Sequence, residues 1–209
     1  HVRLGRHVIL VGHKGHPEVI GTMGQLEVGE VTLIETVEDV EQFVPKDDGE
    51  LGFVTQTTLS VDDTQDVINA MKAKFPDIQA PAAESICYAT TNRQEAVKQA
   101  AEGCDFFIIV GAPNSSNSKR LVEVAKRAGA KQSLLVQRAK EIDWASFEGV
   151  RTLGISAGAS APEVIVEEII DAFKTRFDVK IELAEIIKET ENFLVNRELT
   201  IDDMAFVNG

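Results

Sequence analysis

The sequence lacks the features that would place the protein in a membrane or on a nucleic acid. No apolar run approaches the roughly 18 residues of a membrane-spanning helix. Residues 1–15 also lack the long apolar stretch and the cleavage site of a signal peptide. Cationic side chains are in deficit, because 21 Lys and Arg residues face 34 Asp and Glu residues. The formal net charge of −13 argues against nucleic-acid binding, which normally uses a basic surface.

Cysteine is scarce as well. The chain has two cysteines, Cys87 and Cys104, and neither lies in a CxxC pair. One disulfide bond is possible, but two cysteines exclude the dense disulfide framework of a small secreted domain, so a reducing compartment is expected. Two thiols are also too few for a Cys-rich metal site. The acidic chain repels anions, so an anionic ligand needs a local site of N–H groups, hydroxyls and imidazoles.

The sequence does contain one unit that repeats. An apolar run of strand length is followed by a loop rich in small or hydroxyl side chains and then by an amphipathic helical pattern. The repeats begin near His7, Leu51, Ile86, Cys104 and Val150, and further strands are expected at residues 31–36 and 133–136. This alternation predicts an α/β fold with parallel sheets, and the continuously apolar strands predict helices on both faces.

Apolar residues at helical spacing support the predicted helices. Ile165, Ile169 and Phe173, for example, share one helical face. In a parallel sheet the carboxyl ends of the strands meet at one edge, where ligands collect at the following helix N-termini. All five loops rich in hydroxyl or histidine side chains are expected at that edge.

A domain boundary is expected at residues 76–85, which contain two prolines and three alanines. It divides the chain into a first α/β domain of residues 1–83 and a second of residues 84–174. Residues 175–209 are predicted to form strands or a tail that docks elsewhere. The strand pattern is already under way by Val8, so a preceding N-terminal portion is also expected.

Many Ser and Thr residues stand where a helix is predicted to begin. Three pairs fit the spacing of a capping box: Ser60 with Asp63, Thr91 with Gln94, and Ser160 with Glu163. One cap needs one side chain, yet residues 114–118 offer five candidates and residues 55–58 contain three threonines. Free N–H groups at a helix start also bind phosphate. Two interpretations therefore stay open, plain capping and a phosphate or diphosphate ligand.

Residues 12–19 bring His13, His16 and Glu18 close together. Such a group could bind a metal, cap a helix or perform acid–base chemistry, and imidazole also hydrogen-bonds phosphate. A surface histidine without any of these roles is the plainer alternative. Pro17 fixes the backbone between His16 and Glu18. A carboxyl that is buried beside a bound anion holds its proton more tightly, which suits Glu18 to the role of proton donor.

The two cysteines are predicted to differ in role. Cys87 is expected at the carboxyl end of a short strand, before a helix, where a thiolate is stabilised. It is a candidate nucleophile or metal ligand, with a buried structural cysteine as the alternative. Cys104 precedes a strand and belongs to the opposite edge of the sheet, so we expect it to be structural.

Six stretches of the sequence, taken together and in order, resemble one family. They are residues 15–25 (GHPEVIGTMGQ), 53–64 (FVTQTTLSVDDT), 75–79 (FPDIQ), 86–97 (ICYATTNRQEAV), 114–118 (NSSNS) and 153–163 (LGISAGASAPE). They resemble the 4-hydroxy-3-methylbut-2-enyl diphosphate reductase family, also called LytB. Each motif alone is weak, but the combination is specific and covers nearly the whole chain.

The resemblance implies a fold and a reaction. It implies three similar α/β domains around a 4Fe-4S cluster, of which this chain holds the second and third, with strand-end loops converging on a central site. The tail is implied to dock on the first domain. The implied reaction removes the allylic hydroxyl of 4-hydroxy-3-methylbut-2-enyl diphosphate, giving isopentenyl and dimethylallyl diphosphate, in the last step of the non-mevalonate isoprenoid pathway. An electron donor such as flavodoxin or ferredoxin is implied, in a bacterial cytoplasm or a plastid stroma.

The resemblance also implies roles for individual residues. Cys87 matches a cluster ligand, His16 a diphosphate-binding histidine, and Glu18 the acid that delivers protons. Thr57, with Thr58 beside it, matches the threonine that hydrogen-bonds the substrate hydroxyl. The residues that match the diphosphate-holding loops are Ser115, Ser116, Asn117 and Ser160.

One feature departs from the family. Two of its three cysteine ligands and two further diphosphate-binding histidines belong to the first domain and its junction with the second, which this chain does not include. Because thiolate clusters use more than one cysteine, the chain alone is expected to be incomplete for activity. The alternative is a non-catalytic α/β protein that binds a phosphorylated small molecule without a cluster. A purely structural domain would leave the surplus of hydroxyls unexplained.

Overall fold

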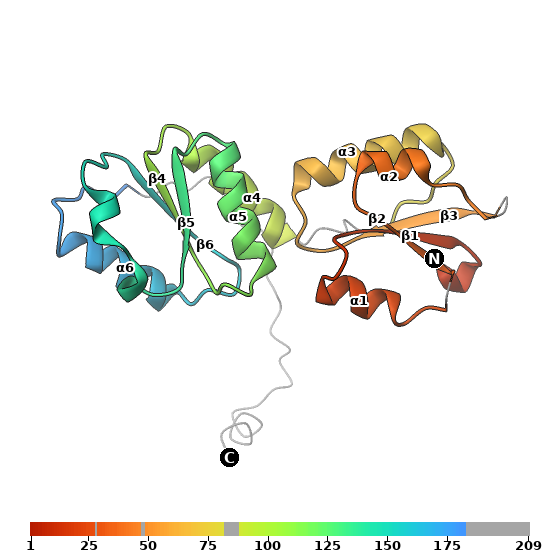
Figure 1. The fold of residues 1–209 in the computed structure, drawn as a ribbon, viewed down its shortest axis with the longest axis horizontal. Helices are drawn as coiled ribbons and strands as arrows, with labels where there is room; N and C mark the ends of the chain where they lie inside the picture. Colours follow the sequence, from red (N-terminus) through yellow and green to blue (C-terminus); the bar gives the residue numbers. More distant parts are fainter. Residues whose placement is uncertain (28, 47–48, 82–87, 183–209) are drawn as a thin grey trace, which may run out of the picture.

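The computed structural model describes residues 1–27, 29–46, 49–81 and 88–182, which form two α/β units side by side (Figure 1). The first unit contains β1 (His7–Val11), α1 (Pro17–Met23), β2 (Val31–Ile34), α2 (Val37–Gln42), β3 (Leu51–Thr55) and α3 (Val61–Lys74). The second contains α4 (Tyr88–Ala101), β4 (Phe106–Val110), α5 (Ser116–Arg127), β5 (Gln132–Val136), β6 (Leu153–Ala157) and α6 (Glu163–Lys174). Short 3₁₀ helices are η1 (Val2–Leu4), η2 (Ala139–Glu141) and η3 (Trp144–Phe147).

Both units have the same sheet topology. The strand orders are β2-β1-β3 and β5-β4-β6, and all four strand pairs are parallel. In each unit the first strand along the sequence, β1 or β4, is the central strand of the sheet, and the next two strands pair with it on opposite sides. The prediction of an α/β fold with repeated parallel sheets is confirmed. The loops after β1, β3, β4 and β6 leave the carboxyl ends of their strands, where ligands are expected to collect.

The first sheet is covered by helices on both faces (Figure 1). The cluster under α2 and α3 comprises Ile9, Val11, Ile34, Val40, Leu51, Phe53, Leu59, Val67, Met71 and Ile78. On the other face lies α1, whose Val19 is buried. The central strand β1 is therefore buried on both sides from Val8 to Val11, which explains its uninterrupted apolar sequence.

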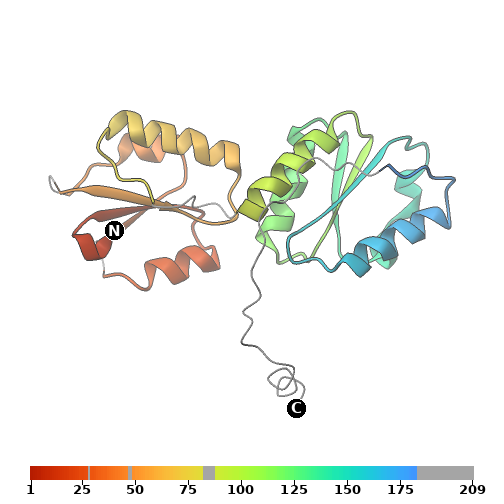
Figure 2. The ribbon, with the colours of Figure 1, turned by 180° about the vertical axis from the view of Figure 1, so that it is seen from behind.

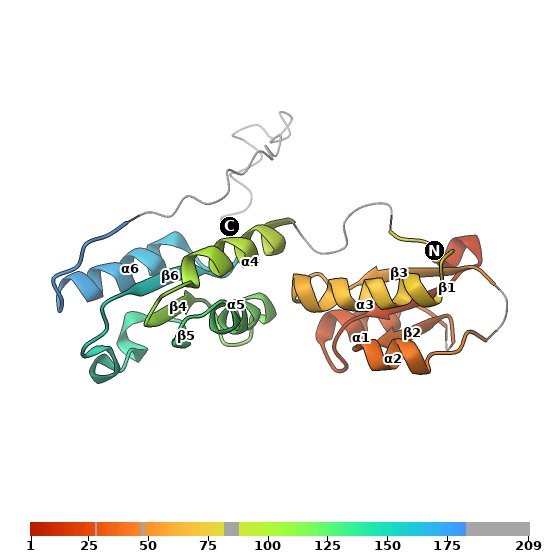
Figure 3. The same ribbon diagram turned by 90° about the horizontal axis from the view of Figure 1, so that it is seen from above.

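The second sheet is also covered on both faces, with α4 and α5 on one side and α6 and η3 on the other. Its central strand β4 is buried at every position. The predicted face of Ile165, Ile169 and Phe173 packs against this strand, so that prediction is confirmed. Figures 2 and 3 show α4 at the side of the second unit that faces the first.

Two of the three predicted helix caps are wrong. Ser60 does cap α3, because its Oγ accepts a hydrogen bond from the Asp63 N–H at 3.3 Å. Thr91, however, lies inside α4, which already begins at Tyr88. Ser160 is not a cap either, because α6 starts after Pro162, which has no side-chain cap bond. The ring of a proline disfavours helical backbone at the residue before it, so the helix begins later than the spacing predicts.

A capping box that the sequence analysis missed begins α2. The Thr36 side chain accepts from the Asp39 N–H, and Asp39 Oδ2 accepts from the N–H groups of Thr36 and Glu35. These backbone hydrogen bonds, first from Glu35 and then from Thr36, lower the pKa of Asp39. The box fixes the turn that follows β2.

Part of the predicted domain division lies outside the described residues. The boundary between residues 83 and 84 falls in the segment 82–87, and most of the expected tail falls in 183–209. Residues 175–182 are described and contain no helix or strand. Among the described helices, none is long and apolar enough to cross a membrane.

Candidate functional site between the two units

His16 connects the two units. It is the N-cap of α1, and its ring Nδ1 accepts from the Glu18 N–H at 3.2 Å. Its Nε2 lies 2.5 Å from Ser116 Oγ at the start of α5. Because a neutral imidazole carries one N–H and Nδ1 is an acceptor, the proton belongs on Nε2, which donates to the serine. The loop after β1 therefore meets the helix start after β4.

Glu18 is held by the loop after β3. Its Oε1 accepts from the Thr57 N–H at 2.9 Å, and its Oε2 accepts from Thr57 Oγ1 at 3.0 Å. The carboxylate is half-buried, and Thr57 is exposed. A carboxyl fixed at two points beside an exposed hydroxyl can pass a proton through that hydroxyl to a bound group. The structure thus brings two of the predicted residues into direct contact.

Thr58 hydrogen-bonds inside the first unit. Its Oγ1 accepts from Gln56 Nε2 at 3.1 Å, and Gln56 Oε1 accepts from the His13 N–H at 3.0 Å. Gln56 is buried and joins the β3 loop to the β1 loop. The sequence analysis did not single out Gln56, whose only signal is its place among the threonines of TQTT.

The polar residues at the start of α5 divide into distinct roles. Ser115 is the N-cap, and its Oγ accepts from the Ser118 N–H at 3.2 Å. Ser116 bonds His16, while Asn114 is exposed. Asn117 is 6% exposed, and within the described residues neither its Oδ1 nor its Nδ2 has a hydrogen-bond partner. A buried amide with both polar atoms free is uncommon and marks a place for a ligand or water.

Ser118 fixes the strand ends beneath this loop. It is fully buried and its Oγ donates to Ser115 Oγ at 3.0 Å. A Cβ added at Gly111 or at Gly158 would collide with the Ser118 hydroxyl. The two glycines follow β4 and β6, so the serine sets how closely both strands approach α5. No sequence signal separated Ser118 from its polar neighbours.

The remaining predicted residues are not brought into this cluster by a described contact. Ser160 is exposed in the loop between β6 and α6 and forms no side-chain hydrogen bond within the described residues. Cys87 lies outside the described residues, directly before the first residue of α4. Cys104 is buried at the opposite sheet edge, where its Sγ donates to the Ala100 carbonyl at 3.1 Å. Burial, helped by the nearby charge of Asp105, raises the pKa of this thiol.

Polar contacts between the units surround the cluster. Gln94 on α4 accepts from the Val61 N–H at 3.0 Å and donates to the Leu59 carbonyl at 2.7 Å. An ion pair joins Lys98 and Asp62 at 2.7 Å. These contacts pin the start of α3 against α4, and the sequence analysis predicted none of them.

Asp63 lies in the same contact and pairs with Arg127 on α5 at 2.8 Å. Burial opposes the charge of Asp63, but the hydrogen bonds and charge of Arg127 outweigh it, so the pKa of Asp63 is lowered. The start of α3 is therefore tied to α5 as well as to α4.

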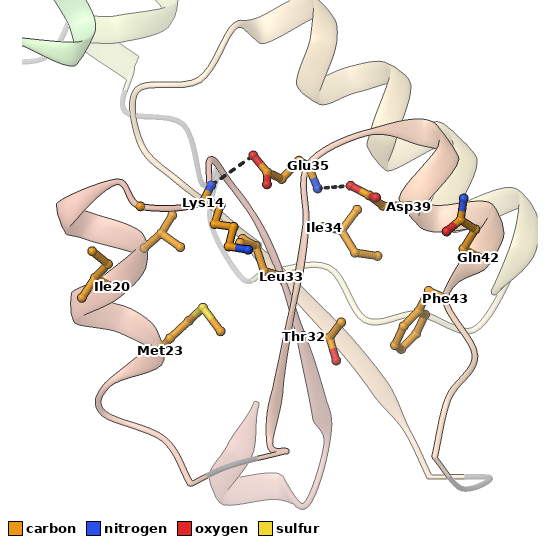
Figure 4. A pocket seen from close by; sticks show the side chains of 12 residues that line it. Lys14, Ile20, Met23, Thr32, Leu33, Ile34, Glu35, Asp39, Gln42 and Phe43 are labelled. Atoms are coloured by element: carbon orange, nitrogen blue, oxygen red, sulfur yellow. Dashed lines mark hydrogen bonds between the residues drawn. The ribbon is translucent and has the colours of Figure 1, made fainter.

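One cavity lies away from this cluster. A hollow of about 730 Å³ runs along the outer edge of β2 between α1 and α2 (Figure 4). Ile20 and Met23 line its α1 side and Leu33 its floor, while Glu35 accepts from the Lys14 N–H at 3.0 Å at its rim. None of the predicted site residues lines it. The predicted residues that the structure brings together therefore lie at the strand ends and not in this groove.

Comparisons with known proteins identify the family. The fold and the site define an α/β protein whose strand-end loops offer hydroxyl, amide and imidazole groups. A family model described as LytB protein matches residues 1–174, and the chain belongs to this family.

Several curated relatives carry the name 4-hydroxy-3-methylbut-2-enyl diphosphate reductase. The one from Rhizobium johnstonii is 71% identical over 214 residues, covering 100% of this chain and 64% of the relative. The relatives from Agrobacterium fabrum and Brucella abortus are 71% and 70% identical, and this chain covers 62% of each. The chain therefore spans less than two thirds of the length of these relatives.

A solved structure also matches, that of the E-1-hydroxy-2-methyl-but-2-enyl-4-diphosphate reductase from Plasmodium falciparum. It has a TM-score of 0.77 and 34% sequence identity, and the match covers 83% of this chain and 54% of that one.

Proposed function

We propose that this chain forms the diphosphate-binding and proton-delivering part of an enzyme that converts 4-hydroxy-3-methylbut-2-enyl diphosphate to isopentenyl and dimethylallyl diphosphate. This is the last step of the non-mevalonate isoprenoid pathway. The observation that carries the proposal is the amide of Asn117, which is 6% exposed and has no hydrogen-bond partner among the described residues. A buried unpaired polar group costs about 1–3 kcal/mol, and a bound phosphate oxygen would accept from the Nδ2 of Asn117 and remove the part of the cost that this donor carries.

The neighbours of Asn117 supply the other donors. The α5 helix is 12 residues long, so its N-terminus presents free N–H groups and the positive end of a helix dipole. Ser116 Oγ accepts from the Nε2–H of His16, which leaves the hydrogen of the Ser116 hydroxyl available to donate. Ser115, Thr58 and Ser160 are proposed as further hydroxyl contacts. Because the chain has a net charge of −13, these local donors must outweigh a repulsive overall field.

Glu18 and Thr57 are proposed to act on the hydroxyl that leaves. The reaction breaks the allylic C–O bond and forms one C–H bond, and it consumes two electrons and two protons to release water. Glu18 would give a proton toward the leaving oxygen, and Thr57, which bonds both carboxylate oxygens of Glu18 through its N–H and its hydroxyl, would hold that oxygen in place. The geometry supports this role because the carboxyl cannot turn away without breaking both bonds.

The electrons need a redox group, and a 4Fe-4S cluster with Cys87 as a ligand is proposed to supply them. The described residues by themselves do not fit a cluster. They contain no group of three or more His, Cys, Asp or Glu residues that could hold a metal ion, and Cys104 is buried at the other edge. Because the chain has only two cysteines, a cluster bound through Cys87 takes its other ligands from outside these 209 residues.

The same proposal includes the domain division and the partners. Residues 1–83 and 84–174 are proposed as the second and third domains of a three-domain enzyme, with residues 175–209 docking on the first domain. Flavodoxin or ferredoxin is the proposed electron donor.

Calorimetric titration of the chain with inorganic diphosphate tests the binding site. Asn117→Leu should weaken binding at least tenfold, because it removes the buried donor. The same variant should unfold at an equal or higher temperature without ligand, because it also removes an unpaired buried amide. Asn114→Leu is the matched control, since Asn114 is exposed and lies two residues before the first residue of α5. Equal affinity in both variants would place the anion elsewhere.

Anaerobic reconstitution of the full-length gene product with iron and sulfide tests the redox part. Cys87→Ser should lower the cluster content and abolish dehydroxylation, whereas Cys104→Ser should keep both. If Cys87→Ser retained cluster and turnover, the ligand assignment would be wrong. If diphosphate bound tightly but no variant or condition gave a cluster, the non-catalytic phosphate-binding alternative would stand.

A further inference from the structure

Helix α5 touches the loop between β1 and α1 at two points, one helical turn apart. Ser116 Oγ lies 2.5 Å from His16 Nε2, and Arg120 Nη2 lies 3.0 Å from His13 Nε2. Residues four apart share one helix face, so both contacts come from the same side of α5. One helix of the second unit therefore grips one loop of the first unit at both of its histidines.

Arg120 is well placed to hold the β1–α1 loop against α5. Its side chain is 13% exposed, and its Nη1 lies 3.9 Å from Asp63 Oδ2 at the start of α3 and also pairs with Glu123. The planar guanidinium can hold several partners in fixed directions at once, which a flexible ammonium cannot do. Arg120 thus contacts both the β1–α1 loop and the start of α3 in the first unit.

The contact fixes the tautomer of His13. A guanidinium only donates, so His13 Nε2 must accept and the ring proton must be on Nδ1. That Nδ1 faces Glu35 Oε2 at 3.7 Å. His16 has the opposite tautomer, with its proton on Nε2. Two histidines three residues apart therefore carry their protons on different nitrogens. The tautomer of His13 depends on Arg120 of α5, whereas that of His16 is set by the Glu18 N–H.

We infer that Arg120 is a positioning residue for the anion site, because it holds His13 and thereby keeps His16 against Ser116. The role of the site as a diphosphate site rests on the proposed function, but the positioning itself does not. Arg120 acts here through His13 and not by contact with the ligand. Loss of the guanidinium should leave both units folded but free the β1–α1 loop from α5.

Imidazole nitrogen NMR on the ligand-free chain tests the positioning directly, because the chain has only four histidines. In the parent, His13 and His16 should show opposite neutral tautomers. Arg120→Gln should shift the His13 signals toward an unbonded mixture of tautomers. In His16 it should change the Nε2 signal, because the bond to Ser116 is lost, while the Glu18 N–H keeps the tautomer. Arg127→Gln is the matched control: its guanidinium comes from the same helix, is 60% exposed, and bonds only Asp63 among the described residues. It should leave both histidines unchanged.

Calorimetry with inorganic diphosphate then tests the consequence for binding. Arg120→Gln and His13→Ala should each weaken binding about tenfold, a typical loss for a hydrogen bond to a charged group. The double variant should lose no more than either single variant, because both remove one interaction. His13→Gln, which keeps an acceptor, should recover part of the affinity. His13→Ala leaves the charge of Arg120 in place and so separates positioning from direct attraction.

Each outcome decides a different point. If Arg120→Gln resembles Arg127→Gln in both the histidine signals and the affinity, the inference is overturned. If Arg120→Gln weakens binding but His13→Ala does not, Arg120 acts by its charge and the route through His13 is overturned. If the histidine signals change as expected but the parent binds no diphosphate, the positioning stands and the proposed function fails. Amide dispersion in the same NMR samples shows whether each variant is folded.

Discussion

Replacement of Gln94 by methionine should destabilise the chain. The loss should exceed that from replacing any other polar residue of α4 by an apolar residue of equal volume. Gln94 is 1% exposed, and its amide bonds the Val61 N–H at 3.0 Å and the Leu59 carbonyl at 2.7 Å. Methionine has a similar size and fills irregular space, so it leaves no cavity. Two lost hydrogen bonds cost about 1 kcal/mol each. The backbone N–H and C=O left unpaired raise the total to roughly 2–5 kcal/mol.

Urea unfolding followed by far-UV circular dichroism measures this loss. With a slope of about 2 kcal/mol per M, the midpoint should fall by on the order of 1–2 M. Gln99→Met is the matched control on the same helix, because Gln99 is exposed and its amide bonds only Glu95 Oε1 at 2.8 Å within the described part of the chain. That control should stay within about 0.5 kcal/mol of the parent.

Equal midpoints for the two variants would refute the reasoning, because they would show that water replaces the Gln94 amide at no cost. A lower slope of unfolding free energy against urea concentration in Gln94→Met would have a different meaning. The slope scales with the surface exposed in one transition, so its fall in Gln94→Met would show that the two units now unfold separately.

Three further predictions follow from particular residues. Gly158→Ala and Gly111→Ala should each cost about 1–3 kcal/mol in urea unfolding, because the new Cβ meets the Ser118 hydroxyl. In a Ser118→Ala background Gly158→Ala should be tolerated, because the new Cβ would lie 3.3 Å from the Cβ of residue 118. Gly111→Ala should still destabilise the fold, because that distance is only 2.7 Å. Equal losses of stability in the two double variants would contradict this packing. The side chain of Lys131, with the N–H groups of Arg151 and Thr152, holds the pKa of Asp105 at about 2 instead of its ordinary 3.8. As the pH falls, the carboxylate of Asp105 is protonated in the unfolded chain before it is protonated in the folded chain. The ionised Asp105 therefore stabilises the fold above pH 3.8, and this stabilisation is lost as the pH falls toward 2. Asp105→Asn should flatten the dependence of unfolding free energy on pH in that range, and an unchanged dependence would show that the pairing is ineffective. Because burial raises the pKa of the Cys104 thiol, mass spectrometry should find Cys104 unmodified by an alkylating reagent at neutral pH until the chain is unfolded; rapid modification of the native chain would contradict its burial.

Much of the fold could be predicted because the local spacing of apolar residues indicates which positions are buried. Residues 106–110 are apolar without interruption, and they form the central strand β4, which is buried at every position. The face of Ile165, Ile169 and Phe173 was predicted from helical spacing alone and packs as expected. The meeting of the loops after β1, β3 and β4 followed from the rule that parallel strands end at one edge, whereas Thr90 and Thr91 of a further predicted loop lie inside α4.

The helix starts were harder to predict, because several nearby residues can compete to cap one helix. Thr91 has the right spacing for a cap but lies inside α4, where Gln94 serves the other unit instead. Thr36 and Asp39 form the capping box that was not predicted.

Contacts between the units were beyond sequence reasoning. Arg120 and His13 are 107 positions apart, and each is an ordinary polar residue in its local pattern. Similarly, nothing in the motif NSSNS distinguishes Asn117, whose amide has no partner in the described part of the chain, from Ser118, which packs against two glycines. Such roles depend on how two separately packed sheets meet, and no local periodicity reports that.

The two units have separate apolar cores, while the named contacts between them are hydrogen bonds and ion pairs, several of them exposed. Salt screens exposed ion pairs but does not weaken buried apolar cores. Rising ionic strength should therefore weaken the contacts between the two units, here called the joint, while each unit stays folded. A ligand that spans both units must then remove the relative motion that the joint permits, and that loss of entropy weakens its binding. Affinity can therefore be raised by stiffening the joint, through substitutions on α4 or α3 that never touch the ligand.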